Sequence, residues 1–306
     1  MSANEIAERT ARIDALGYDY EARDLEPAGD CNLCGSAHRI ELCHRDRYGY
    51  PAVFNVCARC GLGMISPRLT PEEYGHFYES IYRPLVSAFH GRLIDAETVQ
   101  GDQREYTEEL ASFLRRNLAE TPKTLMDIGG STGIVAEILR ADFGCECTVL
   151  DPAPDELAVA AKLGMETIEG FAEDYDPGDR SWDLVLLCQT IDHLLDVRAT
   201  LDAMRRMMGE SGYAFIDVLD VGFMMRRRGS IEGAVKIDHP YYLGRETANA
   251  YFDLAGMEVV AEHASHNGHL GFLLAAGKPS EPDWERLAAS SARFLADAWD
   301  LRAREA

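Results

Sequence analysis

Two short cysteine pairs stand near the start of the sequence. Cys31 and Cys34 form one C-x-x-C-G motif, and Cys57 and Cys60 form a second. The glycine after each pair permits a tight turn that aims backbone N–H groups at sulfur. Two such pairs about 25 residues apart place four thiolates around one tetrahedral ion, and four soft ligands favour Zn²⁺. We predict a structural zinc site, because four protein ligands leave no open position for chemistry.

Histidines supply the candidates for proton transfer. His193 follows the apolar run 184–188, and Asp238, His239 and Tyr242 lie together farther along the chain. The pKa of imidazole suits proton abstraction near neutral pH. We therefore predict His193 or His239 as a general base, with Asp238 and Tyr242 as its catalytic neighbours. A capping or packing role is the competing interpretation for each histidine.

A glycine-rich turn follows the apolar run 124–128 and leads into residues with helical periodicity. Glycines permit a tight bend and let a ligand approach the backbone. The start of the helix adds free N–H groups and partial positive charge. An ordinary strand-to-helix turn without a ligand is the alternative. The predicted cofactor-binding residues of this segment are Asp127, Gly129, Gly130, Ser131 and Gly133.

A second acidic residue, Asp151, ends the next apolar run, 147–150, and lies 18 positions after Gly133. In Rossmann-type folds an acidic residue at this point accepts hydrogen bonds from the ribose hydroxyls of the ligand. We predict that role for Asp151, which is compatible with capping the following helix. Pro152 would then pass beside the adenine base.

The elements that must position these residues alternate between short apolar runs and helical stretches over 123–279. Such alternation predicts βαβ units and a parallel sheet. The end of this region differs, because Asn267-Gly268 separates two strand-like runs and favours a hairpin. The expected fold is α/β, a Rossmann-like seven-stranded sheet with a terminal antiparallel hairpin. The predicted strands are 124–128, 147–150, 184–188, 214–218, 257–262 and 270–276.

The order of these motifs resembles class I S-adenosylmethionine-dependent methyltransferases of types 11 and 12 over about 160 residues. The family motif is an acidic residue followed by G-x-G-x-G, and Ser131 replaces the middle glycine. The resemblance implies S-adenosylmethionine as cofactor. It also implies that the loop carrying Phe171 and Ala172 flanks the adenine, and that Cys188 and Gln189 of the fourth motif belong to the cofactor site.

The stretch Asp238–Leu243 is similar to the E-H-x-x-Y-F segment of sugar C-methyltransferases, which also carry a zinc module before the catalytic domain. Asp238 stands for the glutamate and Leu243 for the phenylalanine, and the extra C-terminal domain of that group is absent from this sequence. The similarity implies a sugar or nucleotide-sugar acceptor. The arginines 226–228 fit a diphosphate handle, against the alternative of a solvated charge run.

Five segments divide the chain by composition and pattern. Residues 1–29 are expected to form a helix and connector, 30–68 the zinc-binding module, and 69–118 a helical cap in which Thr70 precedes Pro71 at a helix start. Residues 119–279 form the expected cofactor-binding domain and 280–306 a C-terminal amphipathic helix. The zinc-binding module and the helical cap are expected to close over the acceptor.

The 306 residues include 30 Lys and Arg against 52 Asp and Glu, a net charge of −22. That surface disfavours nucleic-acid partners and anionic membranes. Without an apolar run of membrane-spanning length or a secretory signal, a cytoplasmic location is expected. The predicted partner is a small-molecule methyl acceptor. O-methylation of another small metabolite, or an inactive zinc-containing scaffold, are the alternatives, and the oligomeric state is left open.

Overall fold

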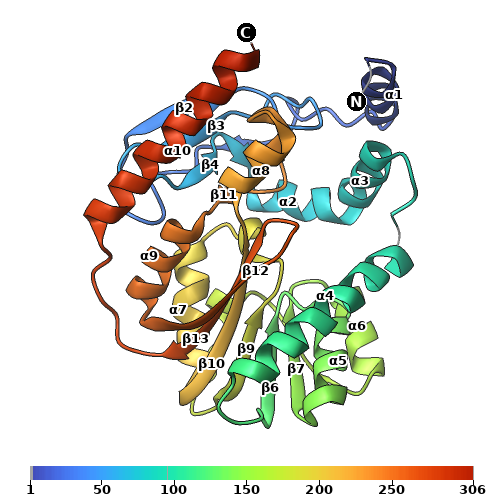
Figure 1. The fold of residues 1–306 in the computed structure, drawn as a ribbon. Helices are drawn as coiled ribbons and strands as arrows, with labels where there is room; N and C mark the ends of the chain where they lie inside the picture. Colours follow the sequence, from blue (N-terminus) through green and yellow to red (C-terminus); the bar gives the residue numbers. More distant parts are fainter. Residues whose placement is uncertain (1–2, 95, 306) are drawn as a thin grey trace. The chain divides into compact units, whose positions relative to one another are not determined.

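The computed structural model describes residues 3–94 and 96–305 (Figure 1). The chain forms two compact units, each drawn from separate stretches of sequence. The cysteine unit comprises Met1–Val99, Val221–Leu243 and Glu285–Ala306, and the sheet unit comprises Gln100–Asp220 and Gly244–Trp284. Within the described residues, no helix combines the length and apolarity needed to cross a membrane.

The sheet unit is built on a seven-stranded sheet of order β12-β13-β10-β9-β6-β7-β8. Strands β10, β9, β6, β7 and β8 are parallel neighbours, whereas β13 runs antiparallel to both β10 and β12. The predicted α/β architecture with a terminal hairpin is therefore confirmed. The strands are β6 (Thr124–Ile128), β7 (Glu146–Asp151), β8 (Glu166–Glu169), β9 (Trp182–Leu187), β10 (Met208–Leu219), β12 (Met257–Ala264) and β13 (His269–Ala276).

Helices bury the apolar side chains of this sheet. One core cluster joins residues of α4, α5 and α6 to inward-facing residues of β6, β7, β9, β10 and β13. Helices α7 and α9 contact each other and strands β9, β10 and β12 (Figure 1). The helices are α4 (Ala96–Asn117), α5 (Ile134–Phe143), α6 (Pro154–Lys162), α7 (Val197–Met207) and α9 (Arg245–Ala255), with short 3-10 turns at η2 (Ala172–Asp174) and η3 (Ile191–His193).

The cysteine unit contains an antiparallel sheet of order β11-β4-β3-β2. Its edge strand β11 pairs Tyr242 with Gly63, and a Cβ on Gly63 would lie 2.8 Å from Cβ of Tyr242. Only glycine permits this close approach. Tyr242 was predicted as a catalytic neighbour of His239 within the expected domain 119–279, and its pairing with Gly63 was not predicted. The strands are β2 (Arg39–Cys43), β3 (Phe54–Cys57), β4 (Gly63–Ile65), β11 (Tyr241–Tyr242), and the separate pair β1 (Leu25–Glu26) and β5 (Arg68–Leu69).

Helices complete the cysteine unit. Thr70 caps α2 by accepting the N–H of Glu73, with Pro71 in the first turn, as predicted. The C-terminal helix α10 packs on the second cysteine turn, since a Cβ on Gly61 would lie 3.0 Å from Cβ of Ser291. The helices are α1 (Ala3–Asp14), α2 (Pro71–His76), the π-turn η1 (Phe77–Ile81), α3 (Tyr82–His90), α8 (Val221–Arg228), the 3-10 turn η4 (Glu232–Ala234) and α10 (Trp284–Glu305).

Candidate functional site

The glycine-rich turn connects β6 to α5 at the carboxyl edge of the large sheet. Gly129 and Gly133 adopt left-handed φ values of 66° and 78°. A Cβ on Gly129 would meet the Thr190 side chain at 2.7 Å, and one on Gly133 would meet Cβ of Ala160 at 3.1 Å. Both positions therefore require glycine, for conformation and for space. The turn lies where ligands bind in open α/β sheets.

Ser131 takes the place of the family's middle glycine and also has a positive φ, 51°. This conformation is uncommon for a residue with a Cβ and costs energy. Two hydrogen bonds hold it: the Ser131 N–H donates to Asp151 Oδ2 and the hydroxyl donates to Glu156 Oε2, both at 2.9 Å. The serine thus adopts the backbone geometry expected of glycine and ties the turn to the next strand–helix unit.

Two carboxylates lie at neighbouring strand ends. Asp127 is 1% exposed, and within the described part of the chain its Oδ2 has no hydrogen-bond partner. Burial, followed by the charge of Asp151, raises the pKa of Asp127 to about 7. Burial also raises the pKa of Asp151, whose Oδ1 and Oδ2 accept the N–H groups of Ala153 and Ser131. Each Asp151 oxygen keeps a second lone pair for a ligand.

Backbone hydrogen bonds join the three predicted cofactor loops. Gly129 N–H donates to Leu150 O at 2.8 Å, and Gly170 N–H donates to Asp151 O at 3.2 Å. The third loop exposes the ring of Phe171, with 56% of the residue accessible, whereas Ala172 is buried. Core packing is therefore excluded for Phe171, and its ring is accessible to a ligand. Pro152 is exposed on the middle loop.

The residues after β9 lie between Asp127 and the end of β10. Gln189 has a positive φ of 53°, and its N–H donates to Asp217 Oδ1. Cys188 is half-buried, and burial, followed by the charges of Asp127 and Asp217, raises the pKa of its thiol well above the usual value. The Cys188 thiol is therefore a neutral group near Asp127.

His193 ends the 3-10 turn η3, which follows β9 at the same edge of the sheet. Its backbone N–H donates to Thr190 O at 2.9 Å, and the residue is half-buried. The same Thr190 packs against Gly129. Thr190 therefore contacts both His193 and Gly129, which places the predicted base near the glycine turn.

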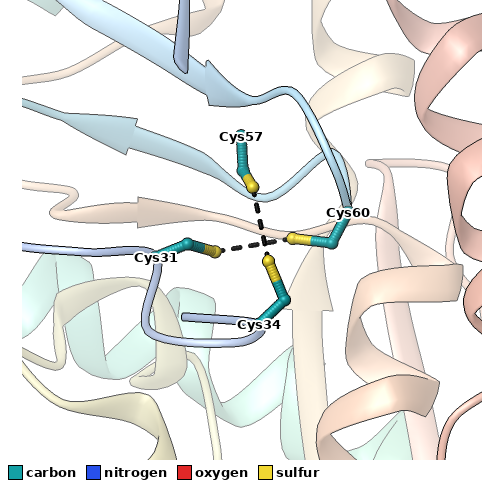
Figure 2. Close-up of side chains that lie close together, drawn as sticks. All are labelled: Cys31, Cys34, Cys57 and Cys60. Atoms are coloured by element: carbon teal, nitrogen blue, oxygen red, sulfur yellow. Dashed lines mark hydrogen bonds between the residues drawn. The ribbon is translucent and has the colours of Figure 1, made fainter. Parts of the chain in front are cut away.

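The four predicted metal ligands of the cysteine unit converge (Figure 2). Cys31 Sγ lies 3.5 Å from Cys60 Sγ, Cys34 Sγ lies 3.5 Å from Cys57 Sγ, and all four sulfurs lie within 4.8 Å of one another. Zn–S bonds of about 2.3 Å in a tetrahedron require sulfur separations near 3.8 Å. The Cys31 and Cys60 thiols, by hydrogen bonding, lower the pKa of Cys57. The donor set and its geometry fit a zinc ion.

Matching turns support these ligands. Gly35 N–H donates to Cys31 O at 2.8 Å and Gly61 N–H donates to Cys57 O at 2.9 Å. Gly35 and Gly61 have positive φ values of 68° and 79°. The two C-x-x-C-G motifs therefore form the same tight turn, in which the glycine N–H donates to the carbonyl of the first cysteine.

Asp238, His239 and Tyr242 belong to the cysteine unit and are buried. Asp238 Oδ2 lies 3.1 Å from Lys236 Nζ and 3.5 Å from His239 Nε2. The Tyr242 hydroxyl accepts the Lys236 N–H and donates to Lys236 O, at 2.6 and 2.7 Å. The ring of Tyr242 packs on Phe54 with centroids 5.0 Å apart. These contacts fix Asp238 and Tyr242 beside Lys236 within the cysteine unit.

The arginines 226–228 form the last turn of α8. Arg226 pairs with Asp297 of α10 at 3.5 Å, and both side chains are exposed. Positive charge also suits the C-terminal end of a helix. The run therefore has a local structural role in addition to any role towards a phosphate.

Sequence analysis did not single out Asp217 of β10 or Tyr106 of α4. Asp217 is buried beside His269, one of three histidines around the Asn267-Gly268 turn. Within the described residues, these histidines do not form a group whose ligand atoms could share one metal ion. Asp217 could have been identified as a candidate from its position near the end of a predicted strand. No feature of the sequence identifies Tyr106.

A protein-family model described as a methyltransferase domain matches residues 102–262. Ubiquinone biosynthesis O-methyltransferases of Azorhizobium caulinodans and Vibrio atlanticus are 28% and 26% identical over 102 and 108 residues, 31% and 33% of this chain. The matches span 40% and 45% of those relatives' lengths. A solved structure from Pyrococcus horikoshii OT3, 18% identical, aligns with a TM-score of 0.50 over 57% of this chain and 91% of its own, a likeness of fold.

Proposed function

Because the chain belongs to the family of S-adenosylmethionine-dependent methyltransferases, we propose that it transfers a methyl group from S-adenosylmethionine to a small-molecule acceptor. The observation that carries the proposal is the cradle at the carboxyl edge of the large sheet. There the glycine turn, Asp127, Asp151 and the exposed ring of Phe171 lie on three loops joined by backbone hydrogen bonds. Open α/β sheets bind nucleotides at this edge.

Each part of the cradle has a proposed role. The glycine turn and the start of α5 approach the cofactor with backbone N–H groups, and Asp151 accepts the ribose hydroxyls. Asp127 places an unpaired carboxylate oxygen beside the turn, which favours the cationic end of the cofactor. The cofactor supplies a methyl group already activated on a sulfonium. The protein then aligns the acceptor for in-line attack.

Calorimetric titration with S-adenosylmethionine tests the proposal. Wild-type protein is expected to bind, and Asp151→Ala to bind about 10–100-fold more weakly, through loss of both ribose contacts. Asp179→Ala, an exposed aspartate of the same unit, is the matched control and keeps wild-type affinity. Absence of binding by wild type, or full binding by Asp151→Ala, rejects the cofactor proposal and leaves the inactive scaffold.

Zinc is the proposed occupant of the four-cysteine site, in a structural role. Support comes from the sulfur separations and from the paired turns at Gly35 and Gly61. Metal analysis is expected to find about one zinc per chain. Cys57→Ser should lose the metal, and a metal-free wild type would reject the assignment.

The acceptor proposal has two chemical forms. O-methylation of a small metabolite is favoured by the names of the curated relatives. A sugar or nucleotide-sugar acceptor is supported by the similarity of Asp238–Leu243 to sugar C-methyltransferases and by the arginines 226–228. Tritiated methyl transfer to phenols, hexoses and nucleotide-sugars separates the two forms.

The proposed base is His193 or His239, with Asp238 and Tyr242 beside the latter. His193 is supported by its place after β9, near the glycine turn, and His239 by its contact with Asp238. Replacing the true base by glutamine should lower turnover about 100-fold while S-adenosylmethionine affinity is kept. Full activity in both variants rejects both assignments.

A further inference from the structure

A cavity of about 400 Å³ opens at the carboxyl edge of the sheet unit. Helix α4, the residue after β9, strand β10 and the β12–β13 hairpin line it, and all of them belong to that one unit. The volume lies in the range of small-molecule sites. Gln189 lies on its wall, directly after Cys188, and Cys188 is near Asp127 of the cofactor cradle.

One wall is polar and incompletely satisfied. Asp217 is 2% exposed, and its Oδ1 accepts the N–H of Gln189. Its Oδ2 makes no hydrogen bond within the described residues and lies 3.5 Å from His269 Nδ1, longer than a normal bond. A buried carboxylate oxygen without a partner is costly and calls for a ligand donor.

Tyr106 of α4 adds a second polar group to this wall. Its hydroxyl is buried and lies beside Asp217 and Cys188, although no hydrogen bond of normal geometry forms to it among the described residues. Burial, followed by the charges of Asp217 and Cys188, raises the pKa of Tyr106 far above its usual range. The hydroxyl therefore stays protonated and available as a donor.

Another part of the cavity lining is aromatic. The rings of Phe113 and Phe215 meet edge to face with centroids 6.0 Å apart, and the imidazole of His263 lies 5.7 Å from the ring of Phe113. Such surfaces pack well against the face or edge of a planar ring.

Charge further restricts the occupant. The exposed Glu105 and Glu109 and the buried Asp217 line the cavity, whereas no Lys or Arg is among the described lining residues. Three carboxylates with no Lys or Arg among the described lining residues disfavour an anionic ligand and favour a neutral or cationic one, although His263, His266 and His269 also line the cavity.

We infer that this cavity is the acceptor subsite and that it takes a neutral or cationic ring compound bearing a hydroxyl group, held by Asp217 and Tyr106, while it excludes anions. The inference rests on the proposed methyltransferase function. It adds the chemical class of the acceptor, and it opposes a nucleotide-sugar as the occupant of this cavity.

Three probes that share a phenol ring and differ in charge test the inference. These are tyramine, p-cresol and 4-hydroxyphenylacetate, each titrated calorimetrically into full-length protein saturated with S-adenosylhomocysteine. Tyramine and p-cresol should bind roughly tenfold or more tightly than 4-hydroxyphenylacetate. The ring proton signals of His263 should shift with tyramine in NMR spectra, whereas those of the exposed His44 in the cysteine unit should not.

Variants assign the selectivity to the cavity. The double variant Glu105→Gln/Glu109→Gln should reduce the preference for tyramine over 4-hydroxyphenylacetate about tenfold. Glu108→Gln, on the exposed part of the same helix and outside the cavity, should leave it unchanged. Asp217→Asn should weaken tyramine binding about tenfold while S-adenosylhomocysteine affinity changes less than about threefold.

The outcomes separate this inference from the proposed function. Tightest binding by 4-hydroxyphenylacetate, no probe binding, or an unchanged preference in the double glutamine variant overturns the acceptor subsite while cofactor binding stands. Failure to bind S-adenosylhomocysteine or S-adenosylmethionine at all overturns the proposed function itself.

Discussion

Each unit of the molecule contains a buried aspartate beside a histidine, and the two pairs differ in their surroundings. Asp238 and His239 of the cysteine unit lie beside Lys236, which compensates the carboxylate at 3.1 Å. Asp217 and His269 of the sheet unit line a cavity without a lysine or arginine among its described residues. The Asp217 side chain is 2% exposed and His269 is 31% exposed.

The comparison indicates how to separate structural polar clusters from ligand sites. A carboxylate with a cation and hydrogen-bonded neighbours stabilises the arrangement that holds it. A carboxylate with an unused lone pair on a cavity wall lowers the stability of the ligand-free protein. A ligand that donates a hydrogen bond to it restores that stability. Residue type alone does not distinguish the two, because both pairs read as Asp and His.

The largest expected effect follows metal removal. The four cysteines of the proposed zinc site belong to the cysteine unit. Strand β11, which follows Asp238 and His239, pairs with β4, and β4 follows the second cysteine turn. Chelation of zinc should raise hydrogen exchange in β3, β4 and β11 by more than about tenfold, because structural zinc contributes folding energy directly. Exchange in β6, β9 and β10 should change little.

The matched variant is Cys43→Ser, which replaces a buried cysteine outside the four. It should retain zinc and the wild-type exchange pattern of β3 and β4. If chelation raised hydrogen exchange equally in both units, the contrast between the two Asp–His pairs would be contradicted.

A smaller effect is expected from neutralising each aspartate. Asp238→Asn leaves Lys236 buried without its carboxylate and should cost about 3–5 kcal/mol of unfolding free energy. Asp217→Asn keeps an oxygen for the Gln189 N–H and should change stability by less than about 1 kcal/mol. Urea unfolding followed by circular dichroism measures both, and similar losses would remove the distinction.

Asp127, the carboxylate proposed to lie beside the cofactor, extends the comparison to the pH dependence of stability. Asp127 has a pKa of about 7 in the folded protein, above its unfolded value near 3.8, so the folded state binds the proton more tightly. Stability therefore falls as pH rises between about 4 and 7. Asp127→Asn should melt several degrees above wild type at pH 8, and the gap should shrink at pH 5.

Asp179→Asn serves as the exposed control and should show no such pH-dependent gap. Saturating S-adenosylmethionine should narrow the gap at pH 8 by stabilising wild type. An equal gap at both pH values would show that burial of the Asp127 charge is not its cause.

The smallest effect comes from two tyrosine hydroxyls. Tyr242→Phe removes hydrogen bonds to both the N–H and the carbonyl of Lys236 and should cost about 1–2 kcal/mol. Tyr106→Phe removes a hydroxyl that has no partner within the described residues, so stability should stay within about 0.5 kcal/mol. Thermal melts of both variants measure the difference, and a larger loss for Tyr106→Phe would reverse the interpretation.

Much of the fold could be predicted from local patterns. The run 124–128 coincides with β6, and Asn267-Gly268 lies between the two hairpin strands. These elements carry their own periodicity and turn residues. Strand β11 could not be predicted in the same way, because its two residues carry no periodic pattern and its position depends on pairing with the distant Gly63.

The residues of the candidate site also differ in whether a local sequence pattern predicts them. The cysteine pairs, the glycine turn and Asp151 are recognisable because their spacing along the chain reflects local geometry. Tyr106 and Asp217 are more than 100 positions apart and meet only because α4 packs on the sheet. Their convergence is a product of tertiary packing, for which the sequence offers no short-range signal.

The discontinuous make-up of the cysteine unit has a consequence for biosynthesis. Its last segment, Glu285–Ala306, supplies the helix that packs on Gly61, and β11 supplies the edge strand of its sheet. A chain emerging from the ribosome presents both cysteine turns long before these pieces exist. Binding of the proposed metal by the nascent chain would hold the two C-x-x-C-G turns together, and the unit would reach its final form only after α10 has been synthesised.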